Sequence, residues 1–324
     1  VDMKFPLCLT LDMQNHIKEP LISSEAIKNV IAETRKRLKL ELTKIYPNSL
    51  VLYFDVQMLQ QAIVEKINEG NKDYVCVPFG NVFNGKIVAN SITKSLHIEK
   101  SFRYDTGEFE ITEYPFYQSI SKQIDVIKAF DKPIILVDDV MHNCHEFIGI
   151  DKVLKEKDVP VKKVIAGILS SQGKDRIEIQ GREVDSAYFI PNLRLWLRES
   201  MLYPFLGGNS VLGEDKPRLN LIPSINQILP YASPSFMNGT SKAVVYNLSK
   251  LCLENAMNIA LSLESEYKKI FDRSLVLKNL YKVLNTPRYP VKGNNINYDL
   301  NQGISNYIEN DIKNLARIES IIKS

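Results

Sequence analysis

The segment KPIILVDDV, residues 132–140, constrains the fold of this chain more than any other stretch. Four apolar residues, 134–137, follow one another and are followed by the paired acids Asp138 and Asp139. A strand of a parallel sheet is buried on both faces, so it shows a continuous apolar run rather than an alternating one. The segment therefore predicts a central strand whose carboxyl end carries two carboxylates.

Elements of similar character recur on both sides of this strand. Short apolar runs predict further strands at 73–80 and 161–171, and a strand that runs into a loop at 183–197. Apolar periodicity with end signals predicts helices at 55–70, 85–97 and 146–157. Strands that alternate with helices favour an α/β fold with a parallel sheet flanked by helices. In such folds ligands bind beyond the carboxyl ends of the strands.

The length of 324 residues suits two domains, and the composition changes at 213–240, where Pro, Ser, Gly and Asn gather. Three parts are predicted: an N-terminal helical or hood segment, an α/β domain, and a linker with an α-helical C-terminal domain, at 1–49, 50–212 and 213–324. A helix is expected at 23–46. The C-terminal helices are expected to cover the sheet or to serve as an arm for dimerisation or for a fused partner domain.

The overall composition excludes several classes of protein. The balance of 41 Lys and Arg against 38 Asp and Glu gives a net charge of +3 without a basic block, so no nucleic-acid partner is expected. No apolar run approaches the roughly 20 residues that span a bilayer, so no membrane partner is expected. The four cysteines are far apart, which argues against disulfides and cysteine zinc sites and favours a reducing cytoplasm.

The stretch VPFGNVFNGKI, residues 77–87, leaves two interpretations open. From Gly80 to Lys86 it has the G-x-x-x-x-G-K spacing of a P-loop, but Ile87 stands where the magnesium-binding Ser or Thr belongs. The alternative is a different phosphate loop that uses only backbone amides. Lys86, expected in the first turn of a helix, is disfavoured there unless an anion is bound, which favours ligand contact.

The paired acids precede a turn into a helix. Because a helix N-terminus favours anions, two carboxylates beside it can hold a sugar and a phosphate together, or Mg²⁺. At these residues the chain resembles a type I phosphoribosyltransferase: IILVDDVM, residues 134–141, matches the first eight positions of that family's signature. The order of further motifs agrees over roughly residues 50–210.

The resemblance implies roles for particular residues. A pyrophosphate loop matches VCVPFGNV, residues 75–82, and a flexible flap matches 101–117. Mg²⁺ and phosphoribosyl pyrophosphate would lie between that loop and the acid pair, with Asp138 and Asp139 as catalytic and metal-binding residues. Pyrophosphate contacts would come from Phe79, Gly80, Asn81, Lys86, Lys100 and Arg103, although the two flap cations, Lys100 and Arg103, could equally be solvated.

The chain departs from the family after the acid pair. A small loop with Gly and Thr normally wraps the 5′-phosphate, but here Glu146 follows four larger residues that are candidates for phosphate binding: His142, Asn143, Cys144 and His145. Loss of a flexible Gly and gain of a carboxylate both oppose a dianionic phosphate, although the histidines and the Asn amide can donate to one.

Aromatic residues near the end of the last predicted strand are candidates for base binding. Phe189 and Trp196 could stack on a base with Asn192 reading its edge, or the aromatics could belong to the core. The first hypothesis is a phosphoribosyltransferase that joins a phosphosugar to a nitrogenous base. The alternatives are a non-catalytic domain of a larger protein that senses a nucleotide or phosphosugar, and a P-loop-like NTPase.

Overall fold

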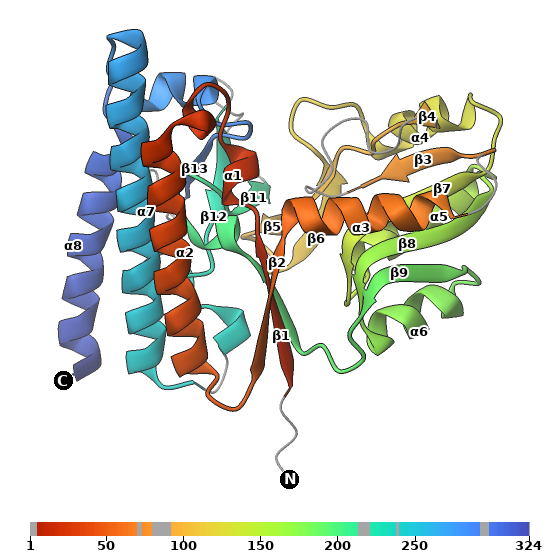
Figure 1. The fold of residues 1–324 in the computed structure, drawn as a ribbon, viewed down its shortest axis with the longest axis horizontal. Helices are drawn as coiled ribbons and strands as arrows, with labels where there is room; N and C mark the ends of the chain where they lie inside the picture. The colour runs from red at the N-terminus through yellow and green to blue at the C-terminus, as the bar shows by residue number, and fades with distance from the viewer. Residues whose placement is uncertain are drawn as a thin grey trace.

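The computed structural model describes residues 5–69, 73–79, 92–212, 221–237, 240–291 and 298–323. Figure 1 shows a sheet with helices packed on it at one side of the molecule and three long helices at the other, namely α2 (Glu25–Ile45), α7 (Lys242–Phe271) and α8 (Ile304–Lys323). Within the described residues, no helix has both the length and the apolar composition needed to cross a membrane.

The predicted parallel sheet is present. Its strands run in the order β4 (Ile92–Thr93), β3 (Val75–Pro78), β7 (Ile134–Met141), β8 (Val161–Leu169) and β9 (Val184–Phe189), and every pair is parallel. β7 is central, and all eight of its residues are buried. The continuous apolar run before the acid pair is therefore explained by burial on both faces.

The two faces of β7 contact different helices. Ile134 and Leu136 belong to a core with α4 (Ile120–Lys128), α5 (His145–Glu156) and α6 (Ser171–Ile179). Ile135 and Val137, which alternate with them, belong to a core with α3 (Val56–Asn68). The chain is thus an α/β protein with a parallel sheet flanked by helices.

Two predicted elements differ from the structure. Of the helix expected at 85–97, residues 92–97 are described and are not helical, because β4 pairs with β3 and Leu96 bridges Phe79. The β-branched pair of β4 suits an edge strand. The segment 183–197, expected as a strand that runs into a loop, contains a second strand after that loop: β9 ends at Phe189, and β10 (Leu195–Arg198) joins another sheet.

The other two sheets join distant parts of the chain. β10 lies beside β1 (Pro6–Leu11), which lies beside β2 (Leu50–Asp55), all parallel. The third sheet has the order β13 (Arg288–Pro290), β12 (Ile222–Ile225), β11 (Asn209–Leu212), β5 (Ile98–Arg103) and β6 (Phe109–Glu113).

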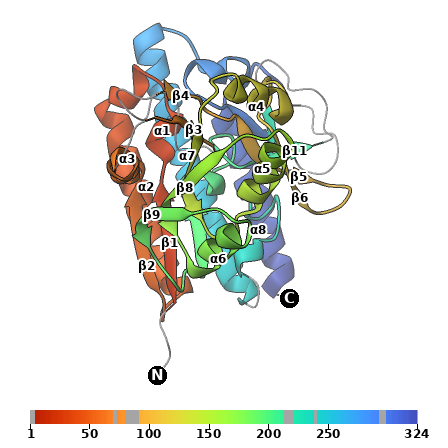
Figure 2. The same cartoon turned by 90° about the vertical axis from the view of Figure 1, so that its right-hand side faces the viewer.

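The hairpin expected within 101–117 is present as β5 and β6, but it is not a free flap. β5 also pairs with β11, and Ser101 and Ser210 share a hydrogen bond of 2.5 Å between their hydroxyls. Figure 2 shows β11, β5 and β6 grouped at one edge of the molecule. The hairpin is therefore anchored through β5, whose second edge pairs with β11, and its predicted flexibility stays a prediction.

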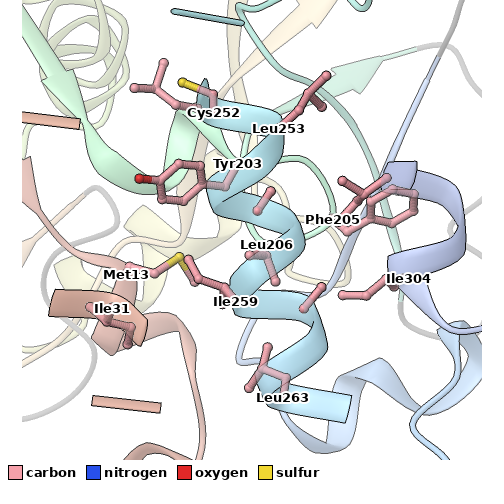
Figure 3. Close-up of a cluster of buried hydrophobic side chains, with 14 of the residues drawn as sticks. Met13, Ile31, Tyr203, Phe205, Leu206, Cys252, Leu253, Ile259, Leu263 and Ile304 are labelled. Carbon is pink, nitrogen blue, oxygen red and sulfur yellow. The ribbon is translucent and has the colours of Figure 1, made fainter. Parts of the chain in front are cut away.

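The long helices share one core with the N-terminal part of the chain. α2 packs on α7, and α7 packs on α8. Short helices complete this region: α1 (Met13–His16), η1 (Leu21–Ser23), η2 (Glu199–Leu202), η3 (Ser235–Met237) and η4 (Leu277–Lys282). Figure 3 shows Met13, Ile31 and Tyr203 around α7, with Ile304 of α8 at its other side. The predicted domain boundaries stay predictions, but this core crosses both of them.

Candidate functional site

The acid pair lies at the carboxyl end of β7 and is buried, with 4% of Asp138 and 1% of Asp139 exposed. The backbone N–H of Asp139 donates to Oδ1 of Asp138 at 2.8 Å. Arg198, the last residue of β10, donates from Nη2 to both carboxylate oxygens of Asp139 at 3.3 Å. A buried ion pair therefore joins the acid pair of β7 to β10, a strand of a different sheet.

Neighbouring charges favour different protonation states for the two carboxyl groups of the acid pair. Burial raises the pKa of Asp138 well above its usual value, and the negative charge of Asp139 raises it further. Burial also raises the pKa of Glu146, in the first turn of α5, although Arg198 opposes this rise. Like charges in a site of low dielectric cannot all ionise easily, so we assign the retained proton to Asp138 while Arg198 pairs with Asp139.

The loop from β7 to α5 makes its turn without glycine. Cys144 caps α5 with φ of 53°, in the left-handed region, where a residue with a Cβ is strained by roughly 1–2 kcal/mol. Burial raises the pKa of the Cys144 thiol to about 12. The thiolate is the reactive form of cysteine, so Cys144 has a structural role here rather than that of a nucleophile.

Helix α6 holds this loop in place. His142 Nδ1 lies 2.9 Å from Ser170 Oγ, and the Asn143 carbonyl accepts from Arg176 Nη1 at 2.7 Å. A Cβ at Gly173 would lie 2.1 Å from the carbonyl oxygen that precedes the loop, so only glycine allows α6 to approach this closely.

The two loop histidines are favoured in their neutral forms. Burial lowers the pKa of His142, and Arg176 lowers it further. Burial also lowers the pKa of His145, with Lys100 and Arg176 acting in the same direction. Neutral imidazoles can each donate one hydrogen bond to a ligand, but they add little positive charge to attract a phosphate.

A cavity of about 790 Å³ opens beside this loop. Among the predicted site residues, it is lined by Asp138, Asp139, Lys100, Trp196 and the loop residues 142–145. Burial lowers the pKa of Lys100, although Glu146 opposes the shift. The structure thus brings the acid pair, the turn into α5 and a cation to one cavity.

Trp196 lies beside the ion pair. Its indole Nε1 donates to Thr10 Oγ1 at 2.9 Å, and the Arg198 guanidinium lies 4.9 Å from the ring centre. This distance suits a cation–π contact, so the ring supports the orientation of Arg198 towards Asp139. The predicted role of Trp196 in base stacking stays a prediction.

Other predicted residues are not brought to the cavity. Phe79 is 1% exposed and packs in the core, and Arg103 pairs with Asp105 and Glu110 on the hairpin. Phe189 and Asn192 are exposed near the end of β9 and do not line the cavity. Gly80, Asn81 and Lys86 lie outside the described residues. The P-loop interpretation depends on these residues, so it is not tested by the structure.

Four buried charged residues that were not predicted from the sequence also line the cavity: Asp12, Glu99, Arg198 and Arg288. Arg288 Nη2 donates to Glu99 Oε2 at 3.1 Å, which joins β13 to β5. The sequence carries one signal for such residues, namely a charged residue that ends or interrupts an apolar strand. A charged group at such a position is rarely buried without a partner. The partner itself is not visible in the sequence.

The acid pair does not form a ready site for Mg²⁺. Within the described residues, no group of three or more His, Cys, Asp or Glu side chains is placed to hold a metal ion. Asp139 is paired with Arg198, and the pKa of Asp138 is raised by burial and by Asp139. One carboxylate of the pair is therefore already engaged by a guanidinium, and Mg²⁺ at Asp138 and Asp139 stays a prediction.

Behind the cavity, Glu199 is fully buried and bonded from two sides. Arg35 Nε donates to Oε2 of Glu199 at 2.9 Å, and the Met13 N–H donates to the same oxygen at 3.2 Å. Burial nevertheless raises the pKa of Glu199 to about 7. The folded protein therefore holds a proton on Glu199 at pH values where an unfolded glutamate has released it.

This raised pKa predicts a pH-dependent stability. Between the ordinary value of 4.5 and about 7, only folded Glu199 is protonated, so the free energy of unfolding falls as pH rises. From pH 5 to 7.5 the loss is about 2 to 3 kcal/mol, at about 1.4 kcal/mol for each pH unit of the interval. Urea unfolding at the two pH values should show a smaller loss in Glu199→Gln than in the unaltered chain. Equal losses would contradict the assignment.

Comparison with known proteins finds structural similarity only. No family model matches the chain, and no curated protein matches it. Among solved structures, it is similar to an adenine phosphoribosyltransferase from Thermoanaerobacter pseudethanolicus, with 12% identity and a TM-score of 0.28 over 41% of this chain and 81% of that one. It is also similar to a purine phosphoribosyltransferase from Pyrococcus horikoshii, with 16% identity and a TM-score of 0.25 over 50% of this chain and 91% of that one.

Proposed function

We propose that this chain binds a phosphorylated ribose, as phosphoribosyl pyrophosphate or a nucleotide, and transfers the phosphoribosyl group to a nitrogenous base with release of pyrophosphate. One observation carries the proposal. The acid pair at the end of the central parallel strand and the turn into α5 line a single cavity. Such strand ends are where α/β folds bind ligands.

Each part of the cavity suits one part of this ligand. The carboxyl groups of Asp138 and Asp139 accept hydrogen bonds from vicinal hydroxyls of the ribose. The N-terminus of α5 favours an anion, as does Lys100 in the wall of the cavity. Because α5 already carries Glu146 in its first turn, a phosphate there binds more weakly than at an unoccupied helix end.

The proposed transfer requires little covalent chemistry from side chains. The bond between C1 of the ribose and the pyrophosphate oxygen breaks as the base nitrogen forms its own bond to C1. Orientation of the two reactants and stabilisation of the charge on the departing pyrophosphate supply most of the rate enhancement. Lys100 is the cation proposed for that charge, because Arg198 and Arg288 are each paired with a carboxylate and Arg194, the other cation of the described wall, lies over the ring of Phe5.

A second candidate function is binding without turnover, as in a sensor of nucleotides or phosphosugars. It is favoured by the ion pair between Arg198 and Asp139, which occupies a carboxylate that the ribose would use. It is also favoured by Glu146, which opposes a 5′-phosphate. The same binding experiment precedes either function, and an assay of pyrophosphate release distinguishes them.

Calorimetric titration with phosphoribosyl pyrophosphate, with and without Mg²⁺, tests the proposal. We expect micromolar binding in the unaltered chain and at least about tenfold weaker binding in Asp138→Ala and in Lys100→Met, since each loses one contact of about 1.4 kcal/mol or more. Lys174→Met is the matched control, because Lys174 is exposed on α6 and does not line the cavity. Absence of heat at millimolar ligand would contradict the proposal.

A further inference from the structure

The same cavity is lined by a polar cluster that the proposed reaction has not used. Asp12 follows β1, His16 ends α1, and Ser200 lies in η2. These three residues come from the N-terminal segment and from the connection after β10, outside the sheet that carries the acid pair.

Ser200 holds the Asp12 carboxylate at both oxygens. Its backbone N–H donates to Oδ1 at 2.9 Å, and its hydroxyl donates to Oδ2 at 2.6 Å. Asp12 is only 4% exposed. Burial raises the pKa of Asp12, but the hydrogen bond and electrostatic attraction of His16, together with the hydrogen bonds from Ser200, outweigh burial, and the pKa lies below its usual value. The carboxylate is therefore ionised and fixed in position.

Asp12 sets the tautomer of His16. Nε2 of His16 lies 3.2 Å from Asp12 Oδ2, and an ionised carboxylate only accepts hydrogen bonds, so Nε2 carries the hydrogen. Nδ1 then has a free lone pair, and no group of the described residues bonds to it. The side chain is 20% exposed, and the His16 carbonyl is fixed by the Asn285 N–H at 2.8 Å. His16 lines the cavity, so the cavity wall contains an imidazole whose orientation is set by Asp12.

This dyad is connected to the acid pair through Arg198. Arg198 pairs with Asp139 and stands two residues before Ser200, which binds Asp12. Thr10, two residues before Asp12, is the register partner of Arg198. The cavity of about 790 Å³ is in the upper part of the range for sites that enclose a drug-sized ligand, so it has room for a second reactant.

We propose that His16, oriented by Asp12, is the general base of the transfer reaction and takes a proton from the acceptor. This inference rests on the proposed function. Nδ1 removes the hydrogen from the reacting ring nitrogen, and the electron pair of that nitrogen forms the bond to C1 of the ribose. The bond from C1 to the pyrophosphate oxygen breaks, and its electron pair leaves with pyrophosphate. The acceptor is therefore a base whose reacting nitrogen carries a hydrogen.

Charged groups from the neighbouring elements also face the dyad. Arg35 of α2 pairs with Glu199 of η2, and Arg198 of β10 pairs with Asp139. The pKa of Glu199 is about 7, so this residue titrates in the same range as a histidine. The pH dependence of the reaction must therefore be measured in Glu199→Gln as well.

The test is pyrophosphate release from phosphoribosyl pyrophosphate with an equimolar mixture of adenine, guanine, hypoxanthine and uracil, between pH 5 and 9. In the unaltered chain and in Glu199→Gln, the rate should rise with pH, as expected of a reaction that depends on a general base. His16→Gln keeps a donor for Asp12 but cannot take a proton, so its rate should fall by about 100-fold without the rising limb. Asp12→Asn, a positioning variant, should lower the rate and shift that limb.

His97→Asn is the matched control, because this imidazole lines the same cavity but stacks on Tyr117 with ring centres 3.9 Å apart. Calorimetry on the same variants separates the two proposals. If His16→Gln binds phosphoribosyl pyrophosphate normally and releases pyrophosphate at the unaltered rate and pH profile, the general-base assignment is wrong. Binding without any release in the unaltered chain overturns it too. Absence of binding in the unaltered chain overturns the proposed function and this inference together.

Discussion

Replacing Asp139 with Asn is expected to lower the free energy of unfolding by about 3 kcal/mol, whereas Asp138→Asn changes it by less than about 1 kcal/mol. The two neighbours differ because Arg198 donates to both carboxylate oxygens of Asp139, while burial and Asp139 favour the protonated, neutral form of Asp138. Asp139→Asn leaves a buried guanidinium without its partner, which is the costly way to break an ion pair. Asp138→Asn exchanges one neutral group for another of similar shape.

Guanidinium chloride unfolding of both variants at pH 7 measures this difference. Arg198→Met, combined with Asp139→Asn, should recover part of the lost stability, because it removes the unpaired charge and fills similar space. Equal losses of stability in Asp138→Asn and Asp139→Asn would contradict the assignment of the proton to Asp138 and of the ion pair to Asp139.

Ile259→Ala is expected to cost about 2 to 5 kcal/mol, the usual range for emptying a buried aliphatic position. Ile259 is fully buried on α7, in the core that also contains Ile31 of α2 and Ile304 of α8. Figure 3 shows it next to Met13, at the meeting point of these segments. Leu261→Ala on the same helix is the control, because Leu261 is 51% exposed and should change stability by less than about 0.5 kcal/mol.

Urea unfolding of Ile259→Ala also addresses the organisation of the chain. If the N-terminal segment and the long C-terminal helices unfold as one unit, the midpoint should shift in a single transition whose slope is unchanged. Two transitions, of which only one shifts, would show that the predicted boundaries separate independent domains despite the shared core.

The central strand and its acids could be predicted because the necessary information is local. A continuous apolar run from Ile134 to Val137 has few alternatives to a strand buried on both faces, and the residues after it lie at the sheet's carboxyl edge. The same holds for α7 and α8, whose apolar periodicity extends over many turns. Local rules failed for β4, where only two residues extend the sheet.

The partners of the buried charges could not be predicted, because they depend on pairings between distant segments. Arg198 and Asp139 are 59 residues apart, and each lies in a different sheet. The sequence shows that Arg198 ends an apolar strand, but not which carboxylate it meets. Similarly, the pairing of the hairpin with β11 depends on four residues with no distinctive pattern. The acid pair could thus be predicted from the sequence, but its ion pair with Arg198 could not.

The ion pair between Glu99 and Arg288 joins residues 189 positions apart across the cavity wall. On the ribosome a chain grows from its N-terminus, at roughly 5–20 residues per second. The acid pair is therefore made well before the segment around Arg288 that completes its surroundings. Until that segment is made, Glu99 lacks the Arg288 partner that it has in the complete chain, so the part of the cavity wall that this ion pair joins is completed late in synthesis.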